Sequence, residues 1–403
     1  MLVKISWRNI WRHPIRSLMI MATITVGILA CALLISFYTG MGEQRVNTSI
    51  EKELSHLQIH HALFKNDYSL KYPIKNGDSI ANLIRANPKV QSASSRTVIQ
   101  GMAATASGST GMMIIGVDPD NEAKTTGISH RIIHGEYFSN EKKNQALISV
   151  RLAKKLRLKP GQKIVLTYSD SSDVLAASAF KVCGFFETNN GPYDDTHLFV
   201  NRTTINQTMG LEDAVYEIAI LLKSNEDLES VKQSLKSNFN NLKIETWKEI
   251  APEVNYVNEV MDSMLYIFMS IIFLAIAFGI INTMHMSILE RTKELGMLMA
   301  LGMNNFRIFS MIILETIFLV IAGSPVGLLL SYFTVDYLHA TGIDLSRFEK
   351  TMSSFGYDQV VYPTIGIHQY LMILIVVGVT ALFSAVFPAR RAIKIIPMKA
   401  IRK

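Results

Sequence analysis

The sequence predicts an α-helical membrane protein with four transmembrane helices and a large α+β extracytoplasmic domain of two lobes between helices one and two. Three observations predict this fold class. Four stretches are long and apolar, a largely polar segment separates the first from the other three, and Lys and Arg are concentrated in the segments expected on one side of the membrane. A helix needs roughly 20 apolar residues to cross ~30 Å of hydrocarbon, and each stretch meets that length.

The four spans are expected at residues 17–42, 263–289, 308–335 and 367–389. The first is too long for the core of a signal peptide, so we expect it to remain in the mature protein. The third contains one acid, Glu315, about 12 Å from Arg307 along a helix. Two interpretations of Glu315 stay open: a functional intramembrane acid, or an ion pair with an arginine at the cytoplasmic end. The same span carries the small residues Gly323 and Gly327 around Pro325, a pattern that allows close helix approach.

Charged residues predict the orientation, because cytoplasmic segments retain Lys and Arg. Residues 1–16 carry four basic residues and no acid, and residues 390–403 carry six and no acid. The loop at 290–307 has one more basic than acidic residue, whereas acids outnumber bases in the loop at 336–366. Both termini and the 290–307 loop are therefore predicted to be cytoplasmic, and residues 43–262 and 336–366 extracytoplasmic. The implied location is a bacterial inner membrane, crossed several times.

The same distribution explains the formal charge of +7. The three cytoplasmic segments hold more than the whole excess of positive charge, and the rest of the chain is net acidic. The basic character thus reflects orientation and contact with anionic lipid headgroups, and we expect no nucleic-acid partner.

The extracytoplasmic segment has mixed periodicity, which predicts an α+β domain. Strands are expected at residues 54–60, 97–105, 112–117, 146–149, 163–168, 179–186, 197–200 and 216–222, and helices at 77–87, 150–156 and 227–239. Residues 247–262 are expected to continue helically into the second span. The first and last pieces would form one lobe, and residues 119–206 the other.

The sequence lacks the patterns that a catalytic subunit would need. It contains no glycine-rich loop with Lys-Ser or Lys-Thr to hold phosphates, so the chain alone is not expected to hydrolyse ATP. His60 and His61 are neighbours on a predicted strand and would point to opposite faces, which prevents them from holding one metal ion together. We therefore expect no catalytic residue, no metal site and no cofactor.

A short charged segment lies between the second and third spans. Its residues are Glu290, Arg291, Glu294, Gly296, Ala300 and Gly302 within the run ERTKELGMLMALG. In one helix Glu290 and Glu294 would share a face, as would Leu298 and Leu301, so a surface helix with its acids toward the cytoplasm is expected. It is either a loop helix that Gly302 caps or a lever that receives motion from another protein.

These residues resemble the permease family typified by the cell-division protein FtsX, the macrolide exporter and the lipoprotein-releasing transporters. The Trp-Arg-Asn-Ile-Trp-Arg run at 7–12 and the Pro-Ala-Arg-Arg-Ala run at 388–392 with Pro397 agree with it. In that family the 290–302 run is a coupling helix that contacts an ATP-binding cassette (ABC) ATPase subunit. The resemblance therefore implies a separate ABC ATPase and a dimer with a second copy or a paralogue.

Segments 116–119, 148–163 and 185–200 are most similar to the lipoprotein-releasing permeases. That similarity implies a lipoprotein substrate, with a periplasmic carrier as a further candidate partner. Acyl chains would then lie at the outer ends of spans one and two, which carry Phe37, Tyr38, Met41, Met264 and Phe268. Aromatic residues at the membrane interface are commonly only anchors in the lipid headgroups. Two other functions stay open: a drug or peptide exporter with an adaptor, and a division-type regulator of an extracytoplasmic hydrolase.

Overall fold

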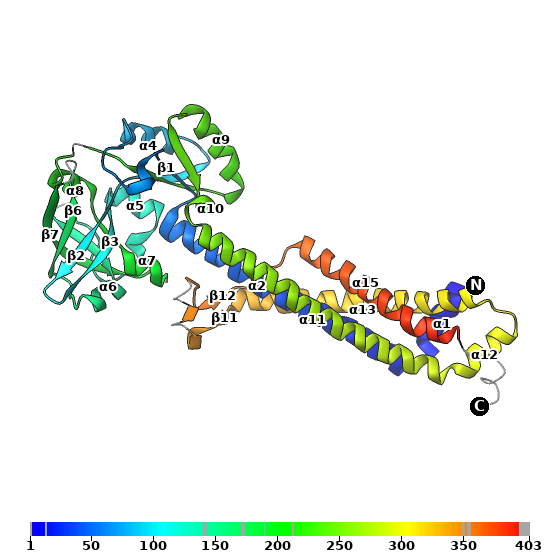
Figure 1. The fold of residues 1–403 in the computed structure, drawn as a ribbon. Coiled ribbons are helices and arrows are strands. Elements are labelled where there is room, and N and C mark those ends of the chain that lie inside the picture. The colour runs from blue at the N-terminus through cyan, green and yellow to red at the C-terminus, as the bar shows by residue number, and fades with distance from the viewer. Residues whose placement is uncertain are drawn as a thin grey trace. The chain divides into compact units, whose positions relative to one another are not determined.

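Figure 1 shows the computed structural model of the chain, which divides into two compact units. The structure describes residues 2–12, 14–139, 143–170, 174–188, 190–211, 213–348, 351–352 and 356–394. The helical unit comprises residues 1–42, 258–344 and 360–403, and the α+β unit comprises residues 43–257 and 345–359. Most of the predicted tail at 390–403, including Pro397, lies outside the described residues.

The helical unit carries the predicted spans. Its long helices are α2 (Pro14–Ser49), α11 (Pro252–Glu290), α13 (Asn305–Thr341) and α15 (Ile367–Ala392). Within the described part of the chain, these are the four helices long and apolar enough to cross a membrane. Each contains one predicted span, and the membrane boundaries inside them stay predictions.

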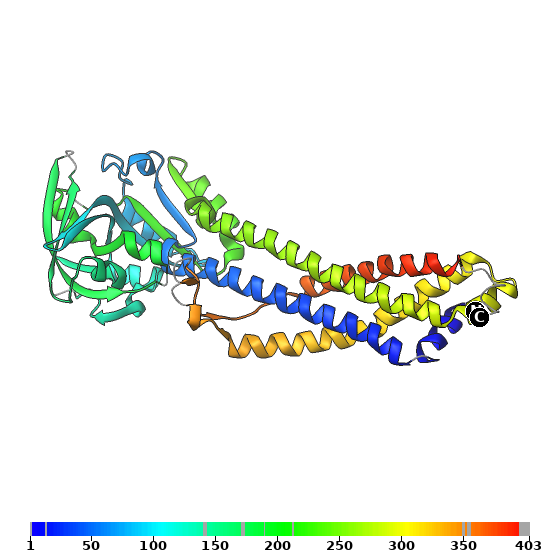
Figure 2. The same ribbon diagram turned by 60° about the horizontal axis from the view of Figure 1, so that its bottom comes forward.

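Two short helices lie at one end of the helical unit, and a short strand pair lies at the other (Figures 1 and 2). The helices are α1 (Leu2–Arg12) and α12 (Thr292–Ala300). The strands β11 (Ile343–Asp344) and β12 (Val360–Val361) pair antiparallel within the predicted 336–366 loop. The segments predicted to be cytoplasmic thus gather at the end opposite the 336–366 loop.

Small residues on α13 let it pack closely against α2. A Cβ atom added to Gly323 would lie 3.2 Å from the carbonyl oxygen of Met21, and one added to Gly327 would lie 3.0 Å from the Cβ of Ile28. The hydroxyl of Thr25 donates a hydrogen bond to the Gly323 carbonyl at 3.2 Å. The Gly-Ser-Pro-Val-Gly segment therefore serves helix packing inside the chain.

In the α+β unit, ten strands among the described residues form one sheet, in the order β10-β1-β9-β2-β3-β8-β5-β7-β4, with β6 paired to β2 and β7. Their bounds are β1 (Leu57–His61), β2 (Val90–Thr105), β3 (Gly108–Val117), β4 (Ile132–Gly135), β5 (Gln145–Ser149), β6 (Lys163–Ser169), β7 (Leu175–Phe186), β8 (His197–Asn201), β9 (Glu217–Leu222) and β10 (Leu242–Thr246). The pairs β3–β8 and β5–β7 are parallel, and the others are antiparallel. The predicted α+β class is confirmed.

The helices of this unit cover the sheet or fill its connections. They are α3 (Phe64–Asp67), α4 (Gly77–Arg85), α5 (Pro119–Thr125), α6 (Val150–Lys155), α7 (Gly191–Thr196), α8 (Arg202–Thr208), α9 (Leu228–Asn238) and α10 (Trp247–Ile250). Helices α4 and α5 pack on β2, and α9 packs on β10. The predicted apolar stripe of α9 is buried at Leu228, Val231 and Leu235.

The long strand β2 joins two hydrophobic cores. Its first half pairs with β9 and places Ala93 in a core with α4 and α9, whereas its second half pairs with β6 and places Ile99 in a core with β5, β7 and β8. At Gly101 a Cβ would lie 2.6 Å from the Thr167 carbonyl oxygen, so this crossing favours glycine. The boundary predicted at residue 119 is wrong, because Ile99, Ala103, Met112 and Ile114 already belong to the second core.

The predicted continuous helix over residues 247–262 is also wrong. Helix α10 ends at Ile250, Ala251 is non-helical with φ −122° and ψ 70°, and α11 begins at Pro252. Proline disfavours a helical conformation in the residue before it and fits the first turn of a helix. The break at Ala251 follows from that preference.

A buried ion cluster lies at the middle of β2. The Arg96 guanidinium donates to Glu122 at 3.0 and 2.7 Å and to Glu217 at 3.0 Å, and all three side chains are buried. Burial alone would lower the pKa of Arg96, but the charges of Glu122 and Glu217 outweigh it and raise that pKa. The cluster links α5 to strands β2 and β9, and the strand periodicity of the sequence gives no sign of it.

Candidate coupling site

The charged segment after the second span forms a helix that differs from the expected one. Helix α11 ends at Glu290, Arg291 has φ −98° and ψ 17°, and α12 begins at Thr292. The prediction that Glu290 and Glu294 share a face of one helix is therefore wrong. The break at Arg291 places Glu290 on α11 and Glu294 on α12.

The far end of α12 closes as the capping prediction expects. The N–H of Gly302 bonds to the Met299 carbonyl at 3.0 Å, and the N–H of Met303 bonds to the Leu298 carbonyl at 3.0 Å. Gly302 has φ +89°, in the left-handed region that glycine adopts without a steric penalty. These two bonds define a Schellman motif, so α12 is a short helix with two fixed ends.

Ion pairs hold the first turn of α12 to its neighbours. Arg291 donates to both carboxylate oxygens of Glu315 at 3.2 and 3.1 Å, and its Nε atom lies 3.4 Å from Glu294. Arg12 lies 3.4 Å from Glu294, and Arg16 pairs with Glu290. Of the two interpretations of Glu315, the structure shows the ion pair with an arginine at the predicted cytoplasmic end of the span.

The candidate coupling residues divide into an inner and an outer group. Arg291 and Gly296 are buried, and Arg291 holds α12 against α13. The Glu290 side chain is 49% exposed and the Glu294 side chain 33% exposed, while Ala300 and Gly302 are exposed. Of the candidate residues, the outer group is the one that solvent reaches.

Three exposed apolar side chains within and after α12 were missed by sequence reasoning. Met297 is 52% exposed, Leu301 85% and Phe306 73%. Leu301 was expected to share a helix face with Leu298, but it lies at the cap after the last helical residue and points away from the buried side. The sequence did contain an indication of this exposure, because these apolar residues lie in the 290–307 loop, which is predicted to face water.

Helix α1 packs on the same end of the helical unit. The Ser6 hydroxyl donates to the Met311 carbonyl at 3.2 Å, and the Trp7 and Phe318 rings meet edge-on with centroids 5.5 Å apart. Ile10 is buried in the core of the helices. The Trp-Arg-Asn-Ile-Trp-Arg run therefore anchors α1 to α13 and places Arg12 beside Glu294.

The predicted substrate-facing residues partly come together where the predicted outer ends of spans one and two fall within α2 and α11. Tyr38 contacts the ring of Phe37 with centroids 6.2 Å apart and that of Phe268 with centroids 6.3 Å apart. Met264 is 49% exposed and Phe268 43%, whereas Met41 is half-buried. The ring contacts thus join three of the five predicted residues, Phe37, Tyr38 and Phe268.

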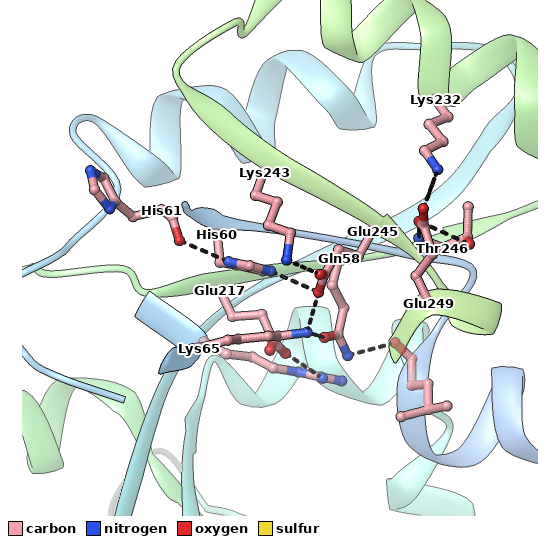
Figure 3. Close-up of polar contacts among 12 residues, drawn as sticks. Gln58, His60, His61, Lys65, Glu217, Lys232, Lys243, Glu245, Thr246 and Glu249 are labelled. Atoms are coloured by element: carbon pink, nitrogen blue, oxygen red, sulfur yellow. Dashed lines mark hydrogen bonds and ion pairs between the residues drawn. The ribbon is translucent and has the colours of Figure 1, made fainter. Parts of the chain in front are cut away.

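The described residues contain no group of three or more His, Cys, Asp or Glu that could hold a metal ion. Figure 3 shows that His60 and His61 point apart. His60 Nε2 lies 2.9 Å from a Glu245 carboxylate oxygen and Nδ1 lies 2.9 Å from the His61 carbonyl oxygen, while His61 stacks on Tyr72. Both ring nitrogens of His60 are thus engaged by oxygen atoms of the protein.

The Glu245 carboxylate is the centre of this cluster (Figure 3). Lys65 donates to it at 2.9 Å, and Lys243 pairs with its other oxygen. Burial alone would raise the pKa of Glu245, but hydrogen bonds from His60, Lys243 and Lys65 outweigh this and hold that pKa well below its usual range. The cluster fixes β1 to β10 and is structural.

Two family models match nearly the whole chain. A MacB-like periplasmic core domain matches residues 17–238, and an FtsX-like permease C-terminal domain matches residues 266–397. The first covers more than half of the chain. The chain therefore belongs to the MacB-like and FtsX-like family of ABC transporter permeases, and it is a multi-pass membrane protein.

Three individual relatives share between 20% and 30% of their residues with this chain over the matched regions. An uncharacterised ABC transporter permease of Methanocaldococcus jannaschii is 30% identical over 229 residues, which are 55% of each chain. The uncharacterised permease YknZ of Bacillus subtilis is 20% identical and covers 82% of this chain and 85% of its own length. A macrolide export ATP-binding/permease protein MacB of Campylobacter jejuni is 21% identical and covers 99% of this chain and 61% of its own. The match to the first of these relatives thus spans about half of that protein.

Among solved structures, the periplasmic region of MacB from Actinobacillus actinomycetemcomitans is 14% identical, with a TM-score of 0.37. It covers 55% of this chain and 97% of that chain.

Proposed function

We propose that this chain is the non-catalytic membrane subunit of an ATP-driven transporter, and that a separate ABC ATPase binds and hydrolyses the nucleotide. One observation carries the proposal. Ion pairs hold the first turn of helix α12 to α1 and α13. The side chains of Met297, Leu301 and Phe306, within and after this helix, are exposed. A surface with this combination suits a docking partner that pushes on the helices.

The ion pairs explain how such a push would travel. The buried pair of Arg291 with Glu315 is costly to break because Glu315 would lose two hydrogen bonds from a cation in a place away from water. Movement of α12 would therefore move α13 as well. The contact between Glu294 and Arg12 would transmit the same movement to α1. The proposed role of Arg291 and Gly296 is to position the coupling helix, while Glu290, Glu294, Ala300 and Gly302 lie where a partner can reach them.

The charge distribution supports an orientation with both termini in the cytoplasm of a bacterial inner membrane. The α+β unit would then face the periplasm, in keeping with the periplasmic core domain that residues 17–238 match. ATP hydrolysis on one side would drive motion in the α+β unit on the other.

The surface of α11 supports a dimer. Only 17% of its apolar span is buried inside the chain, compared with 39% for α2 and for α13. We propose that a second copy or a paralogue covers part of this helix, and that membrane lipids cover the rest.

We propose a lipoprotein as the substrate, taken from the outer leaflet of the inner membrane and passed to a periplasmic carrier. The support is the half-exposed aromatic cluster of Tyr38 and Phe268 at the predicted outer ends of α2 and α11. Such side chains suit an acyl chain, and Met41 and Met264 nearby in sequence offer adaptable apolar surface.

A second candidate is export of a drug or peptide with a periplasmic adaptor. The relatives named macrolide export ATP-binding/permease proteins favour it. Both candidates share the coupling mechanism and differ in what binds between the outer helix ends.

The deciding experiment uses spheroplasts that contain this permease and its ATPase. Release of a radiolabelled lipoprotein to an added carrier, without a change in macrolide resistance, would support the lipoprotein proposal. Macrolide efflux without lipoprotein release would support the exporter. Loss of ATPase co-purification in Leu301→Asp, with normal insertion, would support the docking surface.

A further inference from the structure

The α+β unit contains a cavity that the coupling mechanism does not use. It has a volume of about 720 Å³ and is bounded by the segment after α2, the end of α5 and the segment after β9. Its size lies within the range of small-molecule binding sites. All of its lining residues belong to the α+β unit.

The described lining is strongly basic. It carries the side chains of Lys124, Arg131 and Lys223, and Glu51 is the acid among the described residues that line it. Lys124 and Lys223 are exposed and come from segments far apart in the sequence. Positive charge that converges from separate segments favours an anion.

One buried side chain in the lining has a donor with no partner in the part of the chain that the structure describes. His56 is 8% exposed, and its Nδ1 accepts a hydrogen bond from the Leu222 N–H at 3.1 Å. Because a backbone N–H can only donate, Nδ1 is unprotonated and the ring proton lies on Nε2. Burial lowers the pKa of His56 to about 4, so the ring stays neutral near pH 7. Among the described residues, no partner is found for Nε2.

We propose that this cavity binds an anionic phosphate group, with Lys124, Lys223 and Arg131 supplying charge and the His56 Nε2–H supplying a directed hydrogen bond. A phosphate has several acceptor oxygens, which suits donors that converge from different segments. The group belongs either to a small soluble organophosphate or to the headgroup of an anionic phospholipid. The proposal is independent of the transported substrate.

The test uses the full chain purified in a neutral detergent and titrated by calorimetry with inorganic phosphate and with glycerol 3-phosphate. A parallel arm places the chain in phosphatidylcholine nanodiscs with or without phosphatidylglycerol, and a photo-crosslinker at Gln91 in the cavity lining reports lipid capture. Saturable binding in the first arm identifies a soluble phosphate. Phosphatidylglycerol-dependent crosslinking in the second identifies a lipid headgroup.

Two variants and a control connect binding to these residues. The double variant Lys124→Gln/Lys223→Gln should weaken binding by about tenfold or more, as expected for lost charge-assisted contacts. His56→Asn keeps an acceptor for Leu222 but loses the Nε2 donor, and should weaken binding about fivefold. Lys163→Gln, an exposed lysine on β6, should change nothing. Absence of binding in both arms, or equal affinity in the double variant and the control, overturns the proposal.

Discussion

Arg291 donates two hydrogen bonds to Glu315, at 3.2 and 3.1 Å, and so joins the start of α12 to the interior of α13. Both side chains are buried. The pair neutralises an acid within the third apolar span. It also fixes the position of the break between α11 and α12 against α13. The pair therefore explains why the span contains an acid and why an arginine follows α11.

Removing one partner of this pair should destabilise the helical unit. Arg291→Met removes the side chain that donates two hydrogen bonds to the buried Glu315 carboxylate, and breaking a buried pair from one side typically costs about 3–5 kcal/mol. The double variant Arg291→Met/Glu315→Leu should regain most of that loss, because it removes both charges. Thermal unfolding of the full chain in detergent measures the difference, and equal destabilisation in the single and double variants would contradict the role of the pair.

The docking surface can be tested separately from stability. Leu301→Asp places a charge on a side chain that is 85% exposed, so the chain should insert normally but retain its ATPase poorly in a pull-down. Glu294→Lys should also reduce retention, because it removes the pairs with Arg12 and Arg291. Leu63→Asp, on an exposed leucine of the α+β unit, is the control. Normal ATPase retention in both test variants would leave α12 as an ordinary capped loop helix.

ATP hydrolysis should require a second protein. The sequence has no glycine-rich loop of the kind that holds nucleotide phosphates, so the purified chain is expected neither to bind nor to hydrolyse ATP. Co-expression with its ATPase should restore hydrolysis. Turnover by a preparation shown by mass spectrometry to hold no other protein would refute this expectation.

Topology follows from the distribution of Lys and Arg. A cysteine reporter at Gly108 should react with an impermeant reagent from outside the cell, whereas reporters at Lys293 and Lys403 should react only after the membrane is opened. Labelling of Lys293 from outside would exclude the four-span arrangement.

The substrate path is tested at the outer end of α11. Phe268→Asp should abolish release while the ATPase still docks, because an unpaired carboxylate facing an acyl chain costs more than the roughly 2–7 kcal/mol of a buried neutral polar group. Met264→Asp is expected to act in the same way, and photo-crosslinkers at Met41 and Met264 should capture lipoprotein. Phe333→Asp on α13 controls for a charge on an exposed apolar surface. Capture of lipid alone in an active transporter would favour another substrate.

The Glu245 cluster predicts a pH dependence. Hydrogen bonds lower the pKa of Glu245 in the folded chain below its ordinary value of 4.5, so the stabilisation is fully present above that value and is lost as the pH falls below it. Glu245→Gln should therefore lower the thermal midpoint at pH 7 and have a smaller effect at pH 3. An equal shift at both pH values would show that the carboxylate charge does not matter.

The sequence by itself determined the features that depend on periodicity and composition. Long uncharged stretches require a helix in a membrane, because every backbone group must find its hydrogen-bond partner within the segment. Alternation and turn residues similarly predicted strands such as β5 and β9 and the helix stripe of Leu228, Val231 and Leu235. These signals are local, and the structure follows them.

Only the tertiary structure decided which residues meet. The pairs of Arg291 with Glu315 and Arg96 with Glu122 join segments 24 and 26 residues apart, and no local pattern specifies such a pairing. The break at Arg291 and the exposure of Leu301 likewise follow from packing of α12 against its neighbours. The cavity around His56 gathers three distant segments, since a sheet brings together strands that are remote in the chain. Periodicity thus fixes which face of an element is buried, while packing fixes its partner.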